Sequence, residues 1–103
     1  QYSVEHGDYL EYHQNGQLKS KGKYKIGKKD GMWVSFYDNG QIYEEVNYKK
    51  GYYEGHNITY HSNGEIKSKG LWINGKKNNT WTWYHQNGQL HEELSFKDGE
   101  ISW

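Results

Sequence analysis

The heptapeptide YHQNGQL stands at residues 12–18 and again, unchanged, at residues 84–90. Its Asn-Gly pair recurs at a constant spacing of 24 residues, at Asn15-Gly16, Asn39-Gly40, Asn63-Gly64 and Asn87-Gly88. An aromatic residue stands three positions before each Asn, and Leu or Ile stands three positions after it. A fixed period of this size indicates a repeat architecture. We therefore predict that residues 1–103 form one array of four units, at roughly 7–30, 31–54, 55–78 and 79–103.

Each unit carries two turn signals. Asn-Gly is a strong mark of a tight β-hairpin turn. The second signal is a Gly- and Lys-rich stretch such as KIGKKDG at 25–31, which we expect to form a wider turn. Strand-length runs such as WVSFY at 33–37 lie between the turns, and the chain has no alanine but many Tyr, Trp and Gly residues. This composition favours β-structure. The sequence predicts an all-β fold, a single-layer antiparallel meander of stacked β-hairpin repeats.

The hydrophobic pattern selects a register for the Asn-Gly hairpins. A three-residue loop, made by a type I turn and a glycine in the left-handed region, would pair Tyr12 with Leu18. The same register in the other units places one apolar face across the whole array, since side chains alternate along a strand. The predicted members of this face are Leu10, Tyr12, Leu18, Tyr24, Val34, Phe36, Ile42, Val46, Tyr48, Ile58, Tyr60, Ile66, Trp72, Thr82, Tyr84, Leu90, Leu94 and Phe96.

The charge balance bears on possible partners. Thirteen lysines balance thirteen acidic residues, and arginine is absent. Proteins that bind nucleic acid usually show excess positive charge and use the guanidinium group, so we expect no nucleic-acid partner. The chain has no cysteine and no apolar run of membrane-spanning length, and it opens on Gln1. We expect a soluble fragment without its native N-terminus, from a protein of either cytoplasmic or exported location.

Neither a metal site nor an enzyme is predicted. His13, His61 and His85 share one repeat position, and equivalent strands of neighbouring units lie roughly 9–10 Å apart, too far for shared metal ligands. His85 and His91 are diagonal neighbours that could make only a weak two-ligand contact. Adjacent acids such as Glu44 and Glu45 point to opposite faces of a strand. No nucleophile triad or phosphate-binding loop is present. We expect no catalytic residues, no metal and no cofactor.

Aromatic residues also stand on the face that this register makes polar. Exposed Trp and Tyr side chains are enriched at protein-binding surfaces. The candidate partner-binding residues are Tyr9, Trp33, Tyr37, Tyr43, Trp81 and Trp83. The alternative interpretation is structural: these rings would cover the backbone at Gly22 and Gly70, or lie over lysine side chains on neighbouring strands.

A family resemblance rests on the repeat motif itself. The order of aromatic, Asn-Gly, Leu/Ile, Gly-x-aromatic and then NGKKxGxW runs over essentially the whole chain. It resembles the MORN-repeat variant of bacterial proteins, including the YwqK antitoxin-like family. Unit two departs from the motif at Val46, where units one and three have glycine, and Asn57 stands where the Trp is expected. The resemblance implies stacked hairpins in a single sheet and a role in protein–protein or membrane contacts.

Two functions follow as hypotheses. The first is a non-catalytic scaffold that binds a protein partner, as an antitoxin-like or immunity-like neutraliser would. The second is a surface module that binds anionic lipid or glycan through a lysine stripe in unit one, which zero net charge disfavours. The stripe comprises Lys19, Lys21, Lys23, Lys25, Lys28 and Lys29. An unpaired sheet edge would also permit edge-to-edge self-association or the stacking of further repeats.

Overall fold

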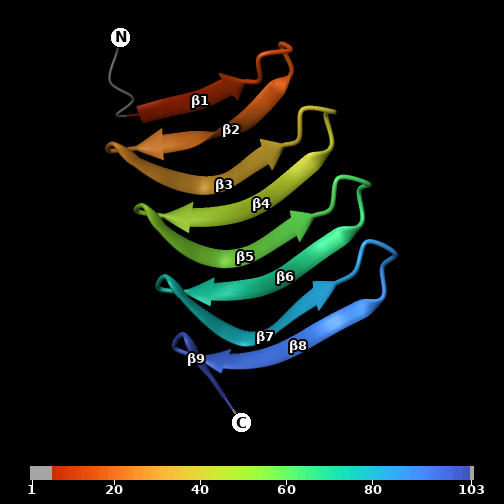
Figure 1. The fold of residues 1–103 in the computed structure, drawn as a ribbon. Helices are drawn as coiled ribbons and strands as arrows, with labels where there is room; N and C mark the ends of the chain where they lie inside the picture. Colours follow the sequence, from red (N-terminus) through yellow and green to blue (C-terminus); the bar gives the residue numbers. More distant parts are fainter. Residues whose placement is uncertain (1–5, 103) are drawn as a thin grey trace.

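The computed structural model describes residues 6–102, which form one antiparallel sheet of nine strands in sequence order (Figure 1). The strands are β1 (His6–Tyr12), β2 (Leu18–Lys25), β3 (Lys28–Phe36), β4 (Ile42–Lys49), β5 (Tyr52–Tyr60), β6 (Ile66–Ile73), β7 (Lys76–Tyr84), β8 (Leu90–Lys97) and β9 (Glu100–Ile101). The extents of 48 × 31 × 14 Å are those of a single curved layer. The predicted all-β meander of stacked hairpins is confirmed.

The Asn-Gly turns all lie at the same end of the strands in Figure 1 and have the predicted three-residue loop. In unit one Gly16 N donates to His13 O at 2.9 Å, His13 N donates to Gln17 O at 2.7 Å, and Gly16 has a φ of 88°. The positive φ explains the glycine, because side-chain-bearing residues rarely adopt it. The resulting pairings are confirmed in all four units: Tyr12 with Leu18, Phe36 with Ile42, Tyr60 with Ile66 and Tyr84 with Leu90.

The turns at the opposite end of the strands are shorter than predicted. Lys25 pairs with Lys28, so only Ile26 and Gly27 form the turn, with φ values of 51° and 74°. Two successive positive φ values define a type I′ turn, whose twist matches that of the strands it joins. The expectation of a wider turn at the Gly- and Lys-rich stretch was therefore wrong. These residues instead belong mostly to the flanking strands.

A β-bulge follows each Asn-Gly hairpin and corrects the predicted apolar face. In unit one Tyr12 pairs with Leu18 but Glu11 pairs with Ser20, which leaves Lys19 as an extra residue. The same irregularity recurs in units two, three and four. One extra residue inverts the face of every side chain beyond it. The prediction of a single apolar face was wrong, because six residues of that set lie on the other side of the sheet, namely Tyr24, Val46, Tyr48, Trp72, Leu94 and Phe96.

The bulge gathers most rings on one side, which we call the aromatic face. It carries Tyr9, Tyr24, Trp33, Val46, Tyr48, Tyr53, Trp72, Trp81, Trp83, Leu94 and Phe96. The core of the protein lies here, because Trp33, Val46 and Trp81 are only 4–5% exposed. Ring contacts run without a gap from Tyr9 to Trp83, with centroid separations between 4.7 and 6.4 Å. A single-layer sheet thus obtains its core from rings that lie along its surface.

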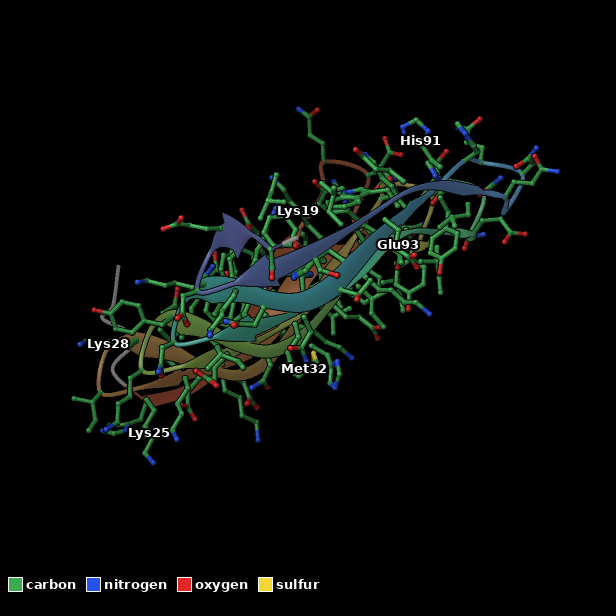
Figure 2. All side chains as sticks on the ribbon, turned by 90° about the horizontal axis from the view of Figure 1, so that it is seen from below. Lys19, Lys25, Lys28, Met32, His91 and Glu93 are labelled. Atoms are coloured by element: carbon green, nitrogen blue, oxygen red, sulfur yellow. The ribbon has the colours of Figure 1, made fainter. Side chains whose placement is uncertain are left out.

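The opposite face carries the predicted hairpin pairs and is more open to solvent. Leu10, Tyr12 and Leu90 are 54–58% exposed there. Lys21, Glu45, Lys69 and Glu93 share this face, because they pair with Leu10, Ile58 and Thr82 in the register of the sheet. Figure 2 shows the two faces edge-on, with Lys19 and His91 on one side of the ribbon and Met32 and Glu93 on the other.

Side chains at the hairpin ends connect each unit to the next. His13 Nε2 lies 2.9 Å from Phe36 O, Tyr37 Oη donates to Tyr60 O at 2.7 Å, and His61 Nε2 lies 2.9 Å from Tyr84 O. The turn asparagines add a second set, in which Nδ2 of Asn15, Asn39 and Asn63 donates to Asp38 O, Ser62 O and Gln86 O. These cross-unit hydrogen bonds hold neighbouring hairpins at one fixed spacing beyond the ends of their strands.

Candidate interaction surface

Two of the six candidate partner-binding residues are core residues. The rings of Trp33 and Trp81 lie against Gly22 and Gly70, where an added Cβ would come within 2.0 Å of a ring atom. Each indole Nε1 donates to a backbone carbonyl, Lys23 O or Leu71 O, at 3.1 Å. The expectation that these two rings stand exposed on a polar face was wrong, because the bulge places them in the core. The structural alternative, rings that cover glycine backbone, is confirmed.

Lysine side chains cover the outer side of these rings. Lys29 Nζ lies 4.6 Å from the Trp33 ring and 5.1 Å from the Tyr48 ring. Lys77 Nζ lies 4.9 Å from the Trp81 ring and 5.7 Å from the Trp83 ring. A cation above a ring face is held by the ring quadrupole. The remaining access to both tryptophans is therefore limited by a charged group.

At the junction of units two and three, Asn57 and Val46 replace the Trp–Gly pair. Asn57, 6% exposed, occupies the position of Trp33 and Trp81, and its partner on the preceding strand is Val46 rather than glycine. Asn57 Nδ2 donates to Glu44 Oε2 at 3.2 Å and to Glu45 O at 3.0 Å, while Trp72 Nε1 donates to Asn57 Oδ1 at 3.0 Å. The buried amide is therefore satisfied on both atoms, and it fixes the Glu44 carboxylate on the aromatic face.

A hollow of about 670 Å³ opens on the aromatic face of units one and two. Tyr9, Trp33, Tyr37 and Tyr43 line it, so the structure brings four of the six candidates together. Tyr37 and Tyr43 form an edge-to-face pair with centroids 5.1 Å apart. Tyr43 is 44% exposed. It is the bulge residue of unit two, where units one and three have Lys19 and Lys67.

Charged groups of both signs surround these rings. Lys19 Nζ lies 3.9 Å from Glu11 Oε2, and Ser20 Oγ donates to Glu11 Oε1 at 3.2 Å. Glu44 and Lys29 line the same hollow. Burial, with a hydrogen bond that the Tyr48 hydroxyl donates to Tyr53, raises the pKa of Tyr48, which also lines the hollow. The hollow thus combines an aromatic floor with a rim of mixed charge, as the central part of a protein-binding surface does.

Trp83 is half-buried on β7 and lies outside this hollow. It contacts Trp81 at 6.4 Å between ring centroids. Four of the six candidates therefore line the hollow, and Trp33 is the core residue among them. Trp81 is a core residue further along the array, with Trp83 beside it.

The lysine stripe of the second hypothesis does not exist as one surface. Lys19 and Lys29 lie on the aromatic face, whereas Lys21, Lys23, Lys25 and Lys28 follow the register of the opposite face. There Lys23 lies between Asp8 on β1 and Asp30 on β3. The bulge at Lys19 and the flanking carboxylates both dilute the positive charge that an anionic surface would meet.

Tyr24 and Tyr48 were not predicted from the sequence as residues of the same surface as Tyr9 and Trp33. They were assigned to the other face, because a bulge leaves no direct mark in the hydrophobic pattern. One signal was present: glycine at 22 and 70 recurs where a neighbouring strand carries Trp, which indicates a ring packed on bare backbone.

In residues 6–102 no group of three or more metal-ligating side chains converges. The same part of the chain contains no helix with the length and apolarity to cross a membrane.

Comparison with known families agrees with the repeat geometry. The family described as MORN repeat variant matches the chain four times, over residues 5–25, 29–50, 53–74 and 77–98. The chain belongs to this MORN repeat variant family, whose repeats are generally non-catalytic interaction modules. A search of curated proteins gives no significant match.

Proposed function

We propose that this array is a scaffold that binds a protein partner through the hollow of units one and two. The observation that supports this most directly is Tyr43, a ring 44% exposed at the rim of a hollow with a continuous aromatic floor. Exposed tyrosine next to packed aromatic residues is the usual composition of a binding hot spot. Elsewhere on the array the bulge position carries Lys or His.

The hollow defines the chemistry of the partner. Its floor fits an apolar or aromatic side chain, and its rim offers carboxylates at Glu11 and Glu44 beside ammonium groups at Lys19 and Lys29. A matching segment would present an aromatic or aliphatic anchor with polar groups of both signs around it. Neither a highly basic nor a highly acidic ligand is favoured by this rim.

The repeat supplies a variant that removes the aromatic rim and should retain the fold. Tyr37→His and Tyr43→Lys together convert the unit-two hairpin to the residues that units one and three carry there, namely His13 with Lys19 and His61 with Lys67. A histidine at position 37 can contact Tyr60 O as His13 contacts Phe36 O. Lys69→Glu on the opposite face is the matched control, since Glu45 and Glu93 occupy that position in other units.

The experiment is affinity capture from native lysate with the wild type, Y37H/Y43K and K69E, followed by quantitative mass spectrometry. A partner retained by the wild type and K69E, and lost with Y37H/Y43K, supports the proposal. Equal retention on all three chains contradicts it. Neutralisation is the more specific form of this function. It requires that co-expression of the wild type, and not Y37H/Y43K, relieves growth inhibition caused by the captured protein.

The lipid or glycan hypothesis gives a different result in the same series. Binding to anionic vesicles would depend on Lys21, Lys23, Lys25 and Lys28, and would be lost as salt is added. It would be unchanged in Y37H/Y43K. Sedimentation with anionic and neutral vesicles at two salt concentrations separates this hypothesis from a protein partner.

A further inference from the structure

We propose that His85 and His91, on the aromatic-face side of the unit-four hairpin, form a two-histidine site for a transition-metal ion such as Zn²⁺ or Ni²⁺. His85 Nε2 lies 3.1 Å from His91 Nδ1, and the two ring centroids are 4.4 Å apart. Both side chains are exposed, and Figure 2 shows His91 at the surface of the sheet. The site is independent of the proposed partner-binding hollow.

The separation of the two nitrogens suits chelation. Zinc–imidazole bonds are about 2.0–2.1 Å long and zinc prefers tetrahedral angles, which places two ligand nitrogens roughly 3.3 Å apart. The observed 3.1 Å needs only a small adjustment of two exposed rings. The bulge supplies this geometry, because it places residue 91 on the same side of the hairpin as the side chain that follows β7.

The same two repeat positions are used differently in the other units. His13 and His61 direct Nε2 at the carbonyls of Phe36 and Tyr84, which occupies the nitrogen that a metal would need. The bulge position that faces them carries Lys19 and Lys67. Within residues 6–102, unit four alone combines a histidine at each position, and there His85 Nε2 faces a second imidazole.

The donor set restricts the ion and its affinity. Imidazole nitrogen suits Zn²⁺, Ni²⁺ and Cu²⁺, whereas Ca²⁺ and Mg²⁺ prefer oxygen ligands. No third ligand from the described residues joins the pair, so water or a donor from another molecule completes the coordination. Both imidazoles must be neutral to bind a metal ion.

The test is titration of the chain with Zn²⁺ or Ni²⁺ alone, followed by isothermal calorimetry and by the imidazole resonances in NMR. The variants are His91→Lys, which restores the residue of units one and three, and His85→Tyr, which restores that of unit two. The control is His56→Thr, which removes an exposed histidine elsewhere and introduces the residue found at Thr80.

We expect one ion per wild-type chain, with shifts concentrated on His85 and His91. Loss of either ligand should weaken binding by at least tenfold, since even changes behind a ligand cost about 10–100-fold. H56T should bind like the wild type. Absence of binding by the wild type, or affinity in H91K and H85Y equal to that of the wild type, would overturn the proposal. A circular-dichroism spectrum for each variant establishes that the sheet is intact.

Discussion

The indole of Trp33 lies flat on Gly22, so close that a methyl group at Gly22 would sit 2.0 Å from Cδ2 of the ring. Trp81 and Gly70 repeat this contact two units later with the same separation. Because the neighbouring atom is part of a rigid ring that is only 5% exposed, the contact has little freedom to relax. The protein is most sensitive to change at this pair, and the repeat offers a natural substitute for it in Val46 and Asn57.

Gly70→Val should destabilise the sheet by about 1–3 kcal/mol or more, as overpacking a tight core does. Combined with Trp81→Asn, which recreates the Val46–Asn57 arrangement, the loss should be smaller than the sum of the two single changes. Residues in direct contact show such coupling, of about 0.5–3 kcal/mol. Urea unfolding followed by circular dichroism measures all three chains. Strict additivity would show that the ring and the glycine do not depend on each other.

Asn57→Ala should cost about 1–3 kcal/mol, because it leaves the Trp72 N–H and the Glu45 carbonyl without their buried partner. Asn57→Asp should cost at least as much, since it removes the amide donor and places a carboxylate beside Glu44. The penalty for Asp should decrease at acidic pH, where the carboxyls become protonated. Thermal melts at neutral and acidic pH test both substitutions. Equal melting temperatures for the wild type and N57A would contradict the assigned network.

The face assignment predicts opposite results for two apolar residues. Val46→Asp introduces a charge at a position that is 4% exposed and should prevent folding. Leu90→Asp affects a residue that is 55% exposed on the other face and should change stability by less than about 1 kcal/mol. Denaturant midpoints measure the difference. Comparable losses from the two changes would mean that both faces are buried to a similar extent.

The cross-unit hydrogen bonds can be tested in two equivalent turns, at Asn63 and at Asn87. Asn63→Asp keeps the acceptor for Glu65 N but loses the donor to Gln86 O, and should cost up to about 1 kcal/mol. Asn87→Asp is the matched control. Among the described residues its side chain contacts only Gln89 N, which the aspartate preserves. N87D should therefore be nearly silent. Urea unfolding measures the loss of stability in both variants. A larger loss in N87D than in N63D would show that the cross-unit hydrogen bond is not what stabilises these turns.

Alkaline pH should weaken the fold through its half-buried tyrosines. Burial, together with the hydrogen bond to Glu45 and its charge, raises the pKa of Tyr60 above the usual value of about 10. Above that pH the unfolded chain releases a proton that the folded chain retains, so the stability present at lower pH is lost as pH rises. Urea midpoints at about pH 8 to 11 should fall, and should fall less steeply in Tyr60→Phe. If the urea midpoints of the wild type and Tyr60→Phe fell equally with pH, a group other than Tyr60 would be responsible for the loss of stability.

Much of this molecule could be predicted from its period. The spacing of Asn-Gly gave the number of hairpins, and pairing Tyr12 with Leu18 gave the correct loop length and register at each turn. Both are local properties, set by the φ values that glycine permits. The faces could not be obtained in the same way. A single unpaired residue such as Lys19 reverses them, and nothing in the alternation of polar and apolar residues records that residue as extra.

The candidate site was predicted only in part for the same reason. Tyr37 and Tyr43 lie next to the turn, where the bulge has not yet changed the register, and both candidates line the hollow. Trp33 was proposed as an exposed partner-binding ring, although packing of its ring on the backbone of Gly22 was already given as the alternative interpretation. A rule that treats Gly22 as a position for a ring, rather than as a weak strand residue, would have located the core.

The alternation of junctions also limits how such a gene can change length. Between successive hairpins, Gly22 meets Trp33, Val46 meets Asn57 and Gly70 meets Trp81. Excision of residues 31–54 would set Gly22 against Asn57 and leave a hole, while excision of 55–78 would force Val46 onto Trp81. Excision of both would bring Gly22 to Trp81 and restore a matched junction. Recombination that respects this chemistry must therefore add or delete hairpins two at a time.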